Sequence, residues 1–126
     1  MTHPITVLIV EDNEGVRRLL RRALVESALL IWECGDGAEA LTAYETHRPD
    51  VVLMDIRMPK VDGLTATRLI VSAHPFARIV MVTDYDDEAL RHAAKEAGAS
   101  AYVLKQNLTN LAELVTSVAG GSAPQP

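Results

Sequence analysis

Short apolar runs alternate with amphipathic segments five times along the chain. Positions within the runs do not alternate between polar and apolar, and several runs are rich in Val and Ile. Both features are typical of parallel strands that are buried on both faces. The five predicted strands are Ile5–Val10, Leu29–Glu33, Val51–Met54, Ile79–Val82 and Ala101–Leu104.

Between the runs, apolar residues recur with a period of about 3.6 residues, which predicts helices. The first helical segment has an apolar stripe on one face and four arginines on the other. The stripe consists of Val16, Leu19, Leu20, Ala23 and Leu24, and the arginines are Arg17, Arg18, Arg21 and Arg22. We expect the arginine face to be solvated or to dock a partner.

The remaining helical segments have recognisable ends. One covers about Ala38–His47 and stops before Pro49, and the next covers about Gly63–Ala73 and stops before Pro75. Both ends agree with the restriction that a proline places on the residue before it. The last two stripes are Leu90, Ala93, Ala94 and Ala97, followed by Gly98, and Leu111, Leu114, Val115 and Val118, followed by Gly120-Gly121.

Five strand–helix units in succession predict a single doubly wound α/β sandwich. Right-handed crossovers place helices on both faces of a five-stranded parallel sheet. The strand order would be 2-1-3-4-5, the flavodoxin-like arrangement. We expect one domain over residues 1–119. Residues 120–126 have the composition of a flexible, then proline-rich, tail or of the start of an interdomain linker.

Composition narrows the class of protein. The chain has 126 residues, 48% of them hydrophobic and 23% charged, which is ordinary for a soluble globular domain. Its net charge of −5 argues against nucleic-acid or membrane binding by this domain. No apolar run approaches the roughly 20 residues that span a bilayer, and the N-terminus lacks a signal-peptide pattern. The lone Cys34 fits a reducing compartment, so we expect a cytoplasmic protein.

Polar residues follow directly after four of the predicted strands. They are Glu11-Asp12 after the first strand, Asp55 after the third, Thr83-Asp84 after the fourth and Lys105 after the fifth. The carboxyl ends of parallel strands meet at one edge of the sheet, where open α/β proteins bind ligands. Because the first and third strands are neighbours in the order 2-1-3-4-5, we expect Asp12 and Asp55 to lie close together.

This set of residues indicates a metal and phosphoryl site. Carboxylates that share a cleft repel each other unless a positive charge joins them. Mg²⁺ prefers oxygen ligands and usually takes one or two protein carboxylates. A bound Mg²⁺, the ammonium of Lys105 and the hydroxyl of Thr83 would together suit a phosphoryl group.

Several segments also give the chain a resemblance to a known family. They are Val10-Glu-Asp-Asn13, Pro49-Asp-Val-Val-Leu-Met-Asp-Ile-Arg-Met-Pro59, Asp62-Gly63, Val82-Thr83 and Gly98-Ala-Ser-Ala-Tyr-Val-Leu-Lys105. From about Ile5 to Val118 the chain resembles the receiver domain of bacterial two-component response regulators. The segment Asp86–Lys105 most resembles receivers that precede a LuxR-type helix-turn-helix domain.

The resemblance implies a role for each residue of the site. Asp55 would accept a phosphoryl group from a sensor histidine kinase. Asp12, Asp55 and the carbonyl of Arg57 would bind Mg²⁺, with Glu11 acting largely through water. Lys105 would hold a phosphoryl oxygen.

The resemblance also implies a switch. Thr83 would contribute to the chemistry by moving its hydroxyl towards the phosphoryl group, and Tyr102 would move inward or outward with it. The domain would not be an enzyme beyond catalysing its own phosphorylation and dephosphorylation. Its output would be transcription, through a DNA-binding domain absent from this chain. A homodimer formed on phosphorylation is a further expectation.

Two positions depart from the family pattern. Asp84 replaces the usual small residue after Thr83, where it would slow access, repel the phosphodonor, help to position hydrolytic water or simply point to solvent. Gln106 replaces the frequent proline after Lys105. A cis bond before a non-proline residue costs about 2.5–4 kcal/mol, so we expect a trans or a strained cis bond there.

Three other functions stay open at this point. A stand-alone receiver would act by protein–protein contacts. A metal-dependent aspartyl phosphohydrolase also uses an Asp at a strand end, but Asp55-Ile56-Arg57 lacks the second Asp of its Asp-x-Asp pattern. A flavin or nucleotide carrier would need a phosphate-binding loop after the first strand, where the chain instead has Glu11-Asp12-Asn13-Glu14.

Overall fold

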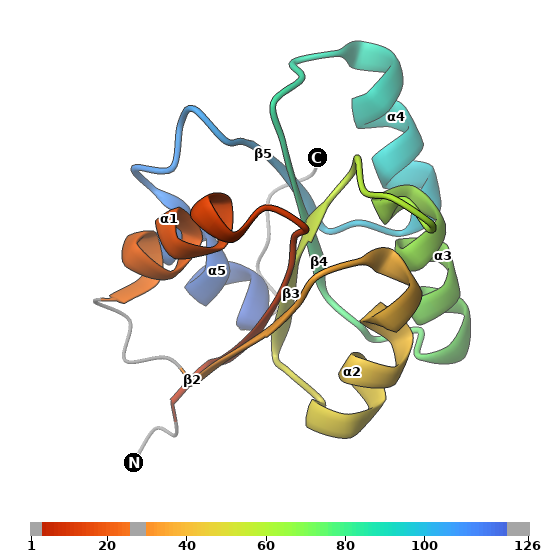
Figure 1. The fold of residues 1–126 in the computed structure, drawn as a ribbon, viewed down its shortest axis with the longest axis horizontal. Helices are drawn as coiled ribbons and strands as arrows, with labels where there is room; N and C mark the ends of the chain where they lie inside the picture. The colour runs from red at the N-terminus through yellow and green to blue at the C-terminus, as the bar shows by residue number, and fades with distance from the viewer. Residues whose placement is uncertain (1–3, 26–29, 121–126) are drawn as a thin grey trace.

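The computed structural model describes residues 4–25 and 30–120, which form alternating strands and helices (Figure 1). The strands are β1 (Thr6–Val10), β2 (Leu30–Cys34), β3 (Val51–Asp55), β4 (Ile79–Thr83) and β5 (Ala101–Leu104). The helices are α1 (Glu14–Leu24), α2 (Ala40–His47), α3 (Gly63–Ala73), α4 (Glu88–Ala97) and α5 (Leu111–Ala119), with a short 3-10 turn, η2 (Gly37–Glu39), before α2. All strand pairs are parallel in the order β2-β1-β3-β4-β5, so the predicted sheet is confirmed.

Two layers of helices cover the sheet (Figure 1). Helices α1 and α5 lie on one face, and α2, α3 and α4 lie on the other. Successive strand residues point to opposite faces. In β1, Val7 and Ile9 join the core beneath α1 and α5, whereas Leu8 and Val10 join the core beneath the other three helices. The apolar runs within β3 and β4 are buried as predicted, and so are the polar residues Asp55 and Thr83 that follow them.

Side-chain caps fix where three helices begin after the loops at the carboxyl edge of the sheet. The capping residues are Asn13 for α1, Asp62 for α3 and Asp87 for α4. Each side chain accepts a hydrogen bond from the backbone N–H three residues further on, at 3.0, 2.8 and 3.1 Å respectively. At the other end of α4, Gly98 adopts a φ of 105°, so the glycine that follows the predicted apolar stripe is the C-cap of the helix.

Helix α1 departs from its predicted pattern on both faces. Leu20 and Leu24 are buried, but Leu19 is 52% exposed, because one residue along a helix is a rotation of about 100° and places Leu19 on the flank of the packed face. On the polar face, Arg17 and Arg21 both pair with Glu33 of β2. We expected a face that is solvated or docks a partner; Arg17 instead lies partly buried against β2 of the same chain, whereas Arg21 is exposed to solvent as expected.

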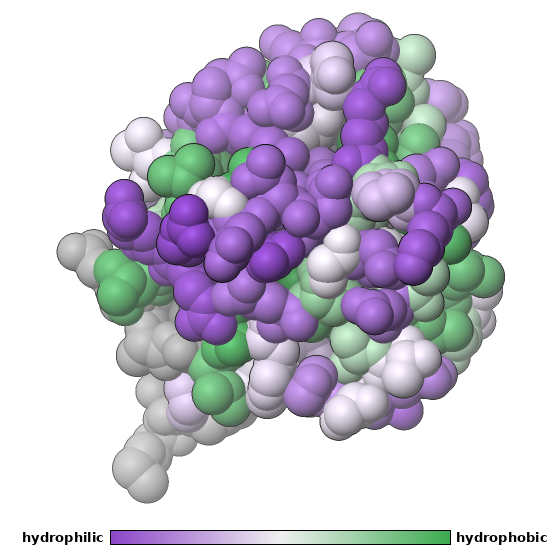
Figure 2. Space-filling view, in the orientation of Figure 1, coloured by the Kyte–Doolittle hydropathy of each residue, from purple (hydrophilic) through white to green (hydrophobic). Residues whose placement is uncertain are grey.

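The surface is mainly hydrophilic (Figure 2), as expected for a domain with 23% charged residues. On the face shown in Figure 2, hydrophilic residues predominate and hydrophobic residues form small separate groups. Within residues 4–25 and 30–120, no helix has the length and apolar character needed to cross a membrane. Leu29, the predicted start of the second strand, and residues 121–126 of the predicted tail lie outside the described part of the chain.

Candidate functional site

A pocket of about 250 Å³ lies at the carboxyl edge of the sheet. It gathers all the residues that the sequence predicted for metal binding and phosphoryl chemistry. Its lining consists of Glu11, Asp12, Asn13, Val16, Asp55, Arg57, Thr83, Asp84, Tyr85 and Lys105. Tyr102, the predicted switch residue, is not part of the lining.

The register of the sheet brings these residues together. Val10 of β1 pairs with Met54 of β3, so the residues that follow them, Glu11 and Asp55, are neighbours. On the other side of β3, Asp55 pairs with Val82 of β4, and the next residue of β4 is Thr83. The backbone N–H of Lys105 donates to the carbonyl of Thr83 at 2.7 Å, which places the lysine at the same edge.

Lys105 joins the two buried carboxylates of the site. Its Nζ lies 2.9 Å from Oε1 of Glu11 and 3.0 Å from Oδ1 of Asp55. The Glu11 and Asp55 side chains are only 2% and 5% exposed, so water screens these charges little. Asp12 is exposed, and one of its oxygens lies within 4.8 Å of oxygens of Glu11 and Asp55.

The electrostatics of the pocket favour a bound cation. Burial raises the pKa of Glu11 to about 7, against hydrogen bonds from Lys105 and from the backbone of Asn13. Burial likewise raises the pKa of Asp55, although Lys105 opposes the change. Burial alone would lower the pKa of Lys105, but its contacts with the two carboxylates outweigh that and raise it. One ammonium therefore does not fully stabilise two buried carboxylates and the adjacent Asp12.

Two glycines allow close backbone contacts at the two ends of the β3–α3 loop, which follows Asp55. A Cβ on Gly63 would lie 1.9 Å from the carbonyl oxygen of Asp55, and one on Gly37 would lie 2.1 Å from the carbonyl oxygen of Val61. The Gly63 N–H also donates to the carbonyl of Ile56 at 2.7 Å. The resemblance included Gly63, but the sequence interpretation gave Gly37 no role, because a glycine near a turn has no spacing that reveals a distant contact.

Thr83 and Tyr102 are linked through Tyr85. The hydroxyl of Thr83, which is buried, accepts a hydrogen bond from the Tyr85 N–H at 3.3 Å. The Tyr102 hydroxyl donates to the Tyr85 carbonyl at 2.6 Å, and the Arg91 guanidinium lies 4.4 Å from the centre of the Tyr102 ring. Tyr102 is 9% exposed and so lies in an inward position. Burial raises the pKa of its phenol.

Two residues that line the pocket make a contact that the sequence interpretation missed. The guanidinium carbon of Arg57 lies 4.4 Å from the centre of the Tyr85 ring. Asp84 is exposed and lines the same pocket. The Lys105–Gln106 bond is trans, since no cis peptide occurs in the described residues.

Comparison with known proteins identifies a family whose sequence pattern the chain matches. Residues 7–119 match the family model for the response regulator receiver domain. The chain is 36% identical over 124 residues to the transcriptional regulatory protein DegU of Brevibacillus brevis, which covers 94% of this chain and 52% of DegU. It is 40% identical over 99 residues to the chemotaxis protein CheY of Halobacterium salinarum, which covers 79% of this chain and 82% of CheY.

Structural similarity agrees with these matches. A crystal structure of a LuxR-family two-component response regulator from Aurantimonas sp. SI85-9A1 superposes with a TM-score of 0.89 at 32% identity, over 98% of this chain and 91% of that one. The chain spans about half the length of DegU. With the fold, the pocket and the family match in agreement, the chain belongs to the receiver-domain family of two-component response regulators.

Proposed function

We propose that this domain is a phosphorylatable switch in which Asp55 is the acceptor. Receiver domains interact with histidine kinases and phosphotransfer partners. An oxygen of the Asp55 carboxylate attacks phosphorus, the P–N bond of the kinase phosphohistidine breaks, and its electron pair returns to the imidazole, which takes up a proton. An aspartyl phosphate on Asp55 and a free kinase histidine result.

The position of Lys105 is the observation that supports this proposal most directly. Its ammonium lies 3.0 Å from the carboxylate of Asp55, the last residue of the buried strand β3. Both residues line the pocket. Phosphoryl transfer needs mainly positioning and stabilisation of the charge on the phosphoryl oxygens. Lys105 supplies a fixed positive charge beside the attacking atom, and Thr83 supplies a hydroxyl on the same pocket wall.

The acidic cluster suits the Mg²⁺ that receiver domains generally bind. Glu11, Asp12 and Asp55 each offer an oxygen within a span of 4.8 Å, which fits an oxygen-preferring cation. Asp12, Asp55 and the Arg57 carbonyl would hold the ion, with Glu11 acting through water. When bound, Mg²⁺ neutralises charge on the phosphoryl oxygens.

The proposed switch involves Thr83 and Tyr102. A phosphoryl group on Asp55 adds about −1.5 to −2 charges and new acceptor oxygens. The Thr83 hydroxyl would donate to one of them and give up its contact with the Tyr85 N–H. Because Tyr102 hydrogen-bonds to the carbonyl of Tyr85, that change reaches the β4–α4 loop and β5. Two arrangements of this segment would give the inactive and active states.

The proposed output is control of transcription in the cytoplasm. DegU is a transcriptional regulatory protein in which this chain covers 52% of the length, and that leaves room for a DNA-binding domain in a protein of the same kind. Contact with DNA would belong to that domain, and a homodimer formed on phosphorylation would couple the two. A stand-alone receiver that acts through protein contacts is the alternative, which the 82% coverage of the CheY relative favours.

Receiver domains are signalling domains rather than conventional enzymes. The phosphohydrolase alternative gains no support from the pocket. Its second Asp would stand at position 57, where Arg57 lies against Tyr85.

Intact-mass spectrometry tests the assignment of Asp55. After incubation with a small acyl phosphate and Mg²⁺, we expect an increase of about 80 Da, the mass of one phosphoryl group. The increase should vanish in EDTA and in Asp55→Asn. The matched control is Asp84→Asn, which removes another carboxylate of the same pocket and should still be labelled. Labelling of Asp55→Asn to the wild-type extent would contradict the proposal.

A further inference from the structure

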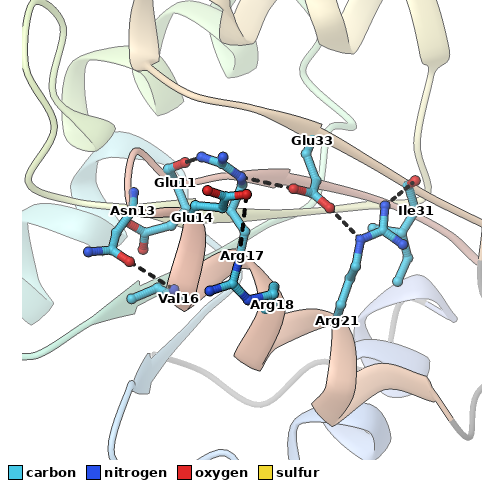
Figure 3. Close-up of polar contacts among 9 residues, drawn as sticks. All are labelled: Glu11, Asn13, Glu14, Val16, Arg17, Arg18, Arg21, Ile31 and Glu33. Carbon is cyan, nitrogen blue, oxygen red and sulfur yellow. Dashed lines mark hydrogen bonds and ion pairs between the residues drawn. The ribbon is translucent and has the colours of Figure 1, made fainter.

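Arg17 of α1 contacts both β2 and the loop after β1, residues 11–13, here called the acidic loop (Figure 3). Its NH1 donates to the main-chain carbonyl of Glu11 at 2.7 Å, and its Nε lies 2.9 Å from Oε1 of Glu33. The Arg17 and Glu33 side chains are 21% and 28% exposed, so water screens the contact between them only in part. A side chain of α1 thus ties the residue that follows β1 to β2.

The Glu11 carbonyl, which accepts the hydrogen bond from Arg17, lies at the start of the acidic loop. The N–H of Glu11 is already fixed by the Cys34 carbonyl of β2 at 3.1 Å, and its carboxylate accepts from the Asn13 N–H at 3.1 Å. The Glu11 carbonyl and the Asp12 N–H belong to one planar peptide group. The hydrogen bond from Arg17 therefore sets the orientation of the peptide from which Asp12 projects.

The neighbouring arginines of α1 show that this contact is particular to Arg17. Arg21 also pairs with Glu33 and donates to the Ile31 carbonyl at 3.2 Å, but within the described residues its hydrogen bonds do not reach the acidic loop (Figure 3). Arg18 is 66% exposed and pairs with Glu14 of its own helix at 3.5 Å. Arg21 is therefore a matched control, because it shares the partner Glu33 and lacks the contact with Glu11.

We propose that Arg17 is a positioning residue for the metal site, with its guanidinium fork clamped by Glu33 so that the Glu11–Asp12 peptide presents both carboxylates to Mg²⁺. This inference rests on the proposed function, since it assumes a cation at Asp12 and Asp55. Groups that orient metal ligands without touching the metal typically change metal affinity by 10- to 100-fold. Arg17 is placed to act in that way.

A positioning role and a purely electrostatic role predict opposite results. The positive charge of Arg17 by itself repels Mg²⁺, so its loss in Arg17→Met would tighten binding if charge alone mattered. If the fork positions the loop, Arg17→Met weakens binding. Arg17→Lys keeps the charge but cannot bond to the Glu11 carbonyl and the Glu33 carboxylate as a planar fork does. Positioning therefore predicts weaker binding in both variants.

Calorimetric titration with Mg²⁺ alone, on the unphosphorylated domain, separates these roles. We expect a dissociation constant roughly tenfold higher in Arg17→Lys and Arg17→Met than in wild type, and a change of less than about twofold in Arg21→Lys. Hydrogen exchange of the Glu11 amide, which donates to the Cys34 carbonyl, should speed up in the Arg17 variants and not in Arg21→Lys. If the Arg17 variants fail to fold, Glu33→Gln releases the same fork from β2. Because loss of the Glu33 charge alone would also weaken Mg²⁺ binding, the deciding measurement in that variant is hydrogen exchange of the Glu11 amide, which positioning predicts to be faster than in wild type.

The outcomes distinguish this inference from the function on which it rests. Arg17→Lys with the affinity of Arg21→Lys, or Arg17→Met with tighter binding than wild type, overturns the positioning role while Asp55 phosphorylation stands. Absence of Mg²⁺ binding by the wild-type domain overturns both.

Discussion

At the scale of single residues, the site contains carboxylates that the fold buries away from water, where their charged form is unfavourable. Asp55 and Glu11 are almost fully buried, and burial raises the pKa of both despite the ammonium of Lys105. A raised carboxyl pKa means that the ionised form is less stable in the folded protein than in the unfolded chain. The acceptor carboxylate therefore reduces the stability of the domain at neutral pH when no cation is bound.

Neutralising Asp55 should stabilise the metal-free domain. In EDTA at pH 7, we expect Asp55→Asn to raise the melting temperature by several degrees, where about 1 kcal/mol corresponds to roughly 3–6 °C for a domain of this size. Lys105 keeps its second partner, Glu11, so the variant leaves no unpaired ammonium. Thermal unfolding followed by circular dichroism measures the change. Asp84→Asn, at an exposed position of the same pocket, should shift it little, and a lower melting temperature for Asp55→Asn would contradict the interpretation.

The single cysteine is predicted to be unreactive. Burial, with a contribution from the charge of Glu39, raises the pKa of Cys34 to about 11. Only the thiolate reacts, and a free cysteine has a pKa of about 8.5, so alkylation by iodoacetamide at about pH 8 should be roughly a hundredfold slower than in a short peptide. Glu39→Gln should speed the reaction up, whereas Glu113→Gln, on α5, should not. A peptide-like rate in the folded domain is the result that would refute this prediction.

At the scale of elements, the hydrophobic pattern predicted which segments are strands but ended three of them one residue early. The predicted strands stop at Glu33, Met54 and Val82, whereas β2, β3 and β4 continue to Cys34, Asp55 and Thr83. The pattern reports which side chains are buried, but a strand continues as long as its backbone pairs. The pairs Asp55–Val82 and Thr83–Leu104 extend the ladder through two polar residues of the site.

Contacts between distant elements could not be predicted in the same way. The sequence placed the site carboxylates and Lys105 correctly, because each directly follows a buried run and parallel strands share one carboxyl edge. Arg17 looked like its neighbours on a polar helix face, and only the position of β2 shows that it reaches Glu33. The stacking of Arg57 on Tyr85 likewise depends on how two loops approach each other.

The approach of α3 to β3 predicts a sharp difference between two glycines. Gly63→Ala would place a Cβ 1.9 Å from the carbonyl oxygen of Asp55, so α3 or the end of β3 must move. We expect a loss of about 3 kcal/mol in the free energy of unfolding, measured in urea. Gly15→Ala is the control in the first turn of α1, where the nearest atom is a side-chain oxygen of Asn13 at 3.2 Å and the cost should be below about 1 kcal/mol. Equal effects of the two substitutions would refute the close approach.

At the scale of the whole molecule, the apolar strands of the sheet stabilise the fold, whereas the carboxylates gathered at its carboxyl edge destabilise it. The apolar strands bury two continuous cores, one beneath each helical layer. The same parallel topology collects Glu11, Asp12 and Asp55 at one end, in a domain whose net charge is already −5. In natural proteins, energetically unfavourable arrangements such as these close carboxylates occur mainly at functional sites. A cation that reduces the repulsion among the three carboxylates should therefore stabilise the entire fold.

Mg²⁺ should therefore raise the melting temperature, and Asp12 offers the sharpest test. A ligand that binds only the native state stabilises it by about 2.7 kcal/mol at a hundredfold excess over its dissociation constant. Because Asp12 is exposed, Asp12→Asn should melt within about 2 °C of wild type in EDTA but lose most of the rise that saturating MgCl₂ causes. NaCl of equal ionic strength controls for general screening of the acidic surface. A wild-type-sized rise in Asp12→Asn, measured by scanning calorimetry, would place the stabilising Mg²⁺ elsewhere on that surface and contradict the assigned metal site.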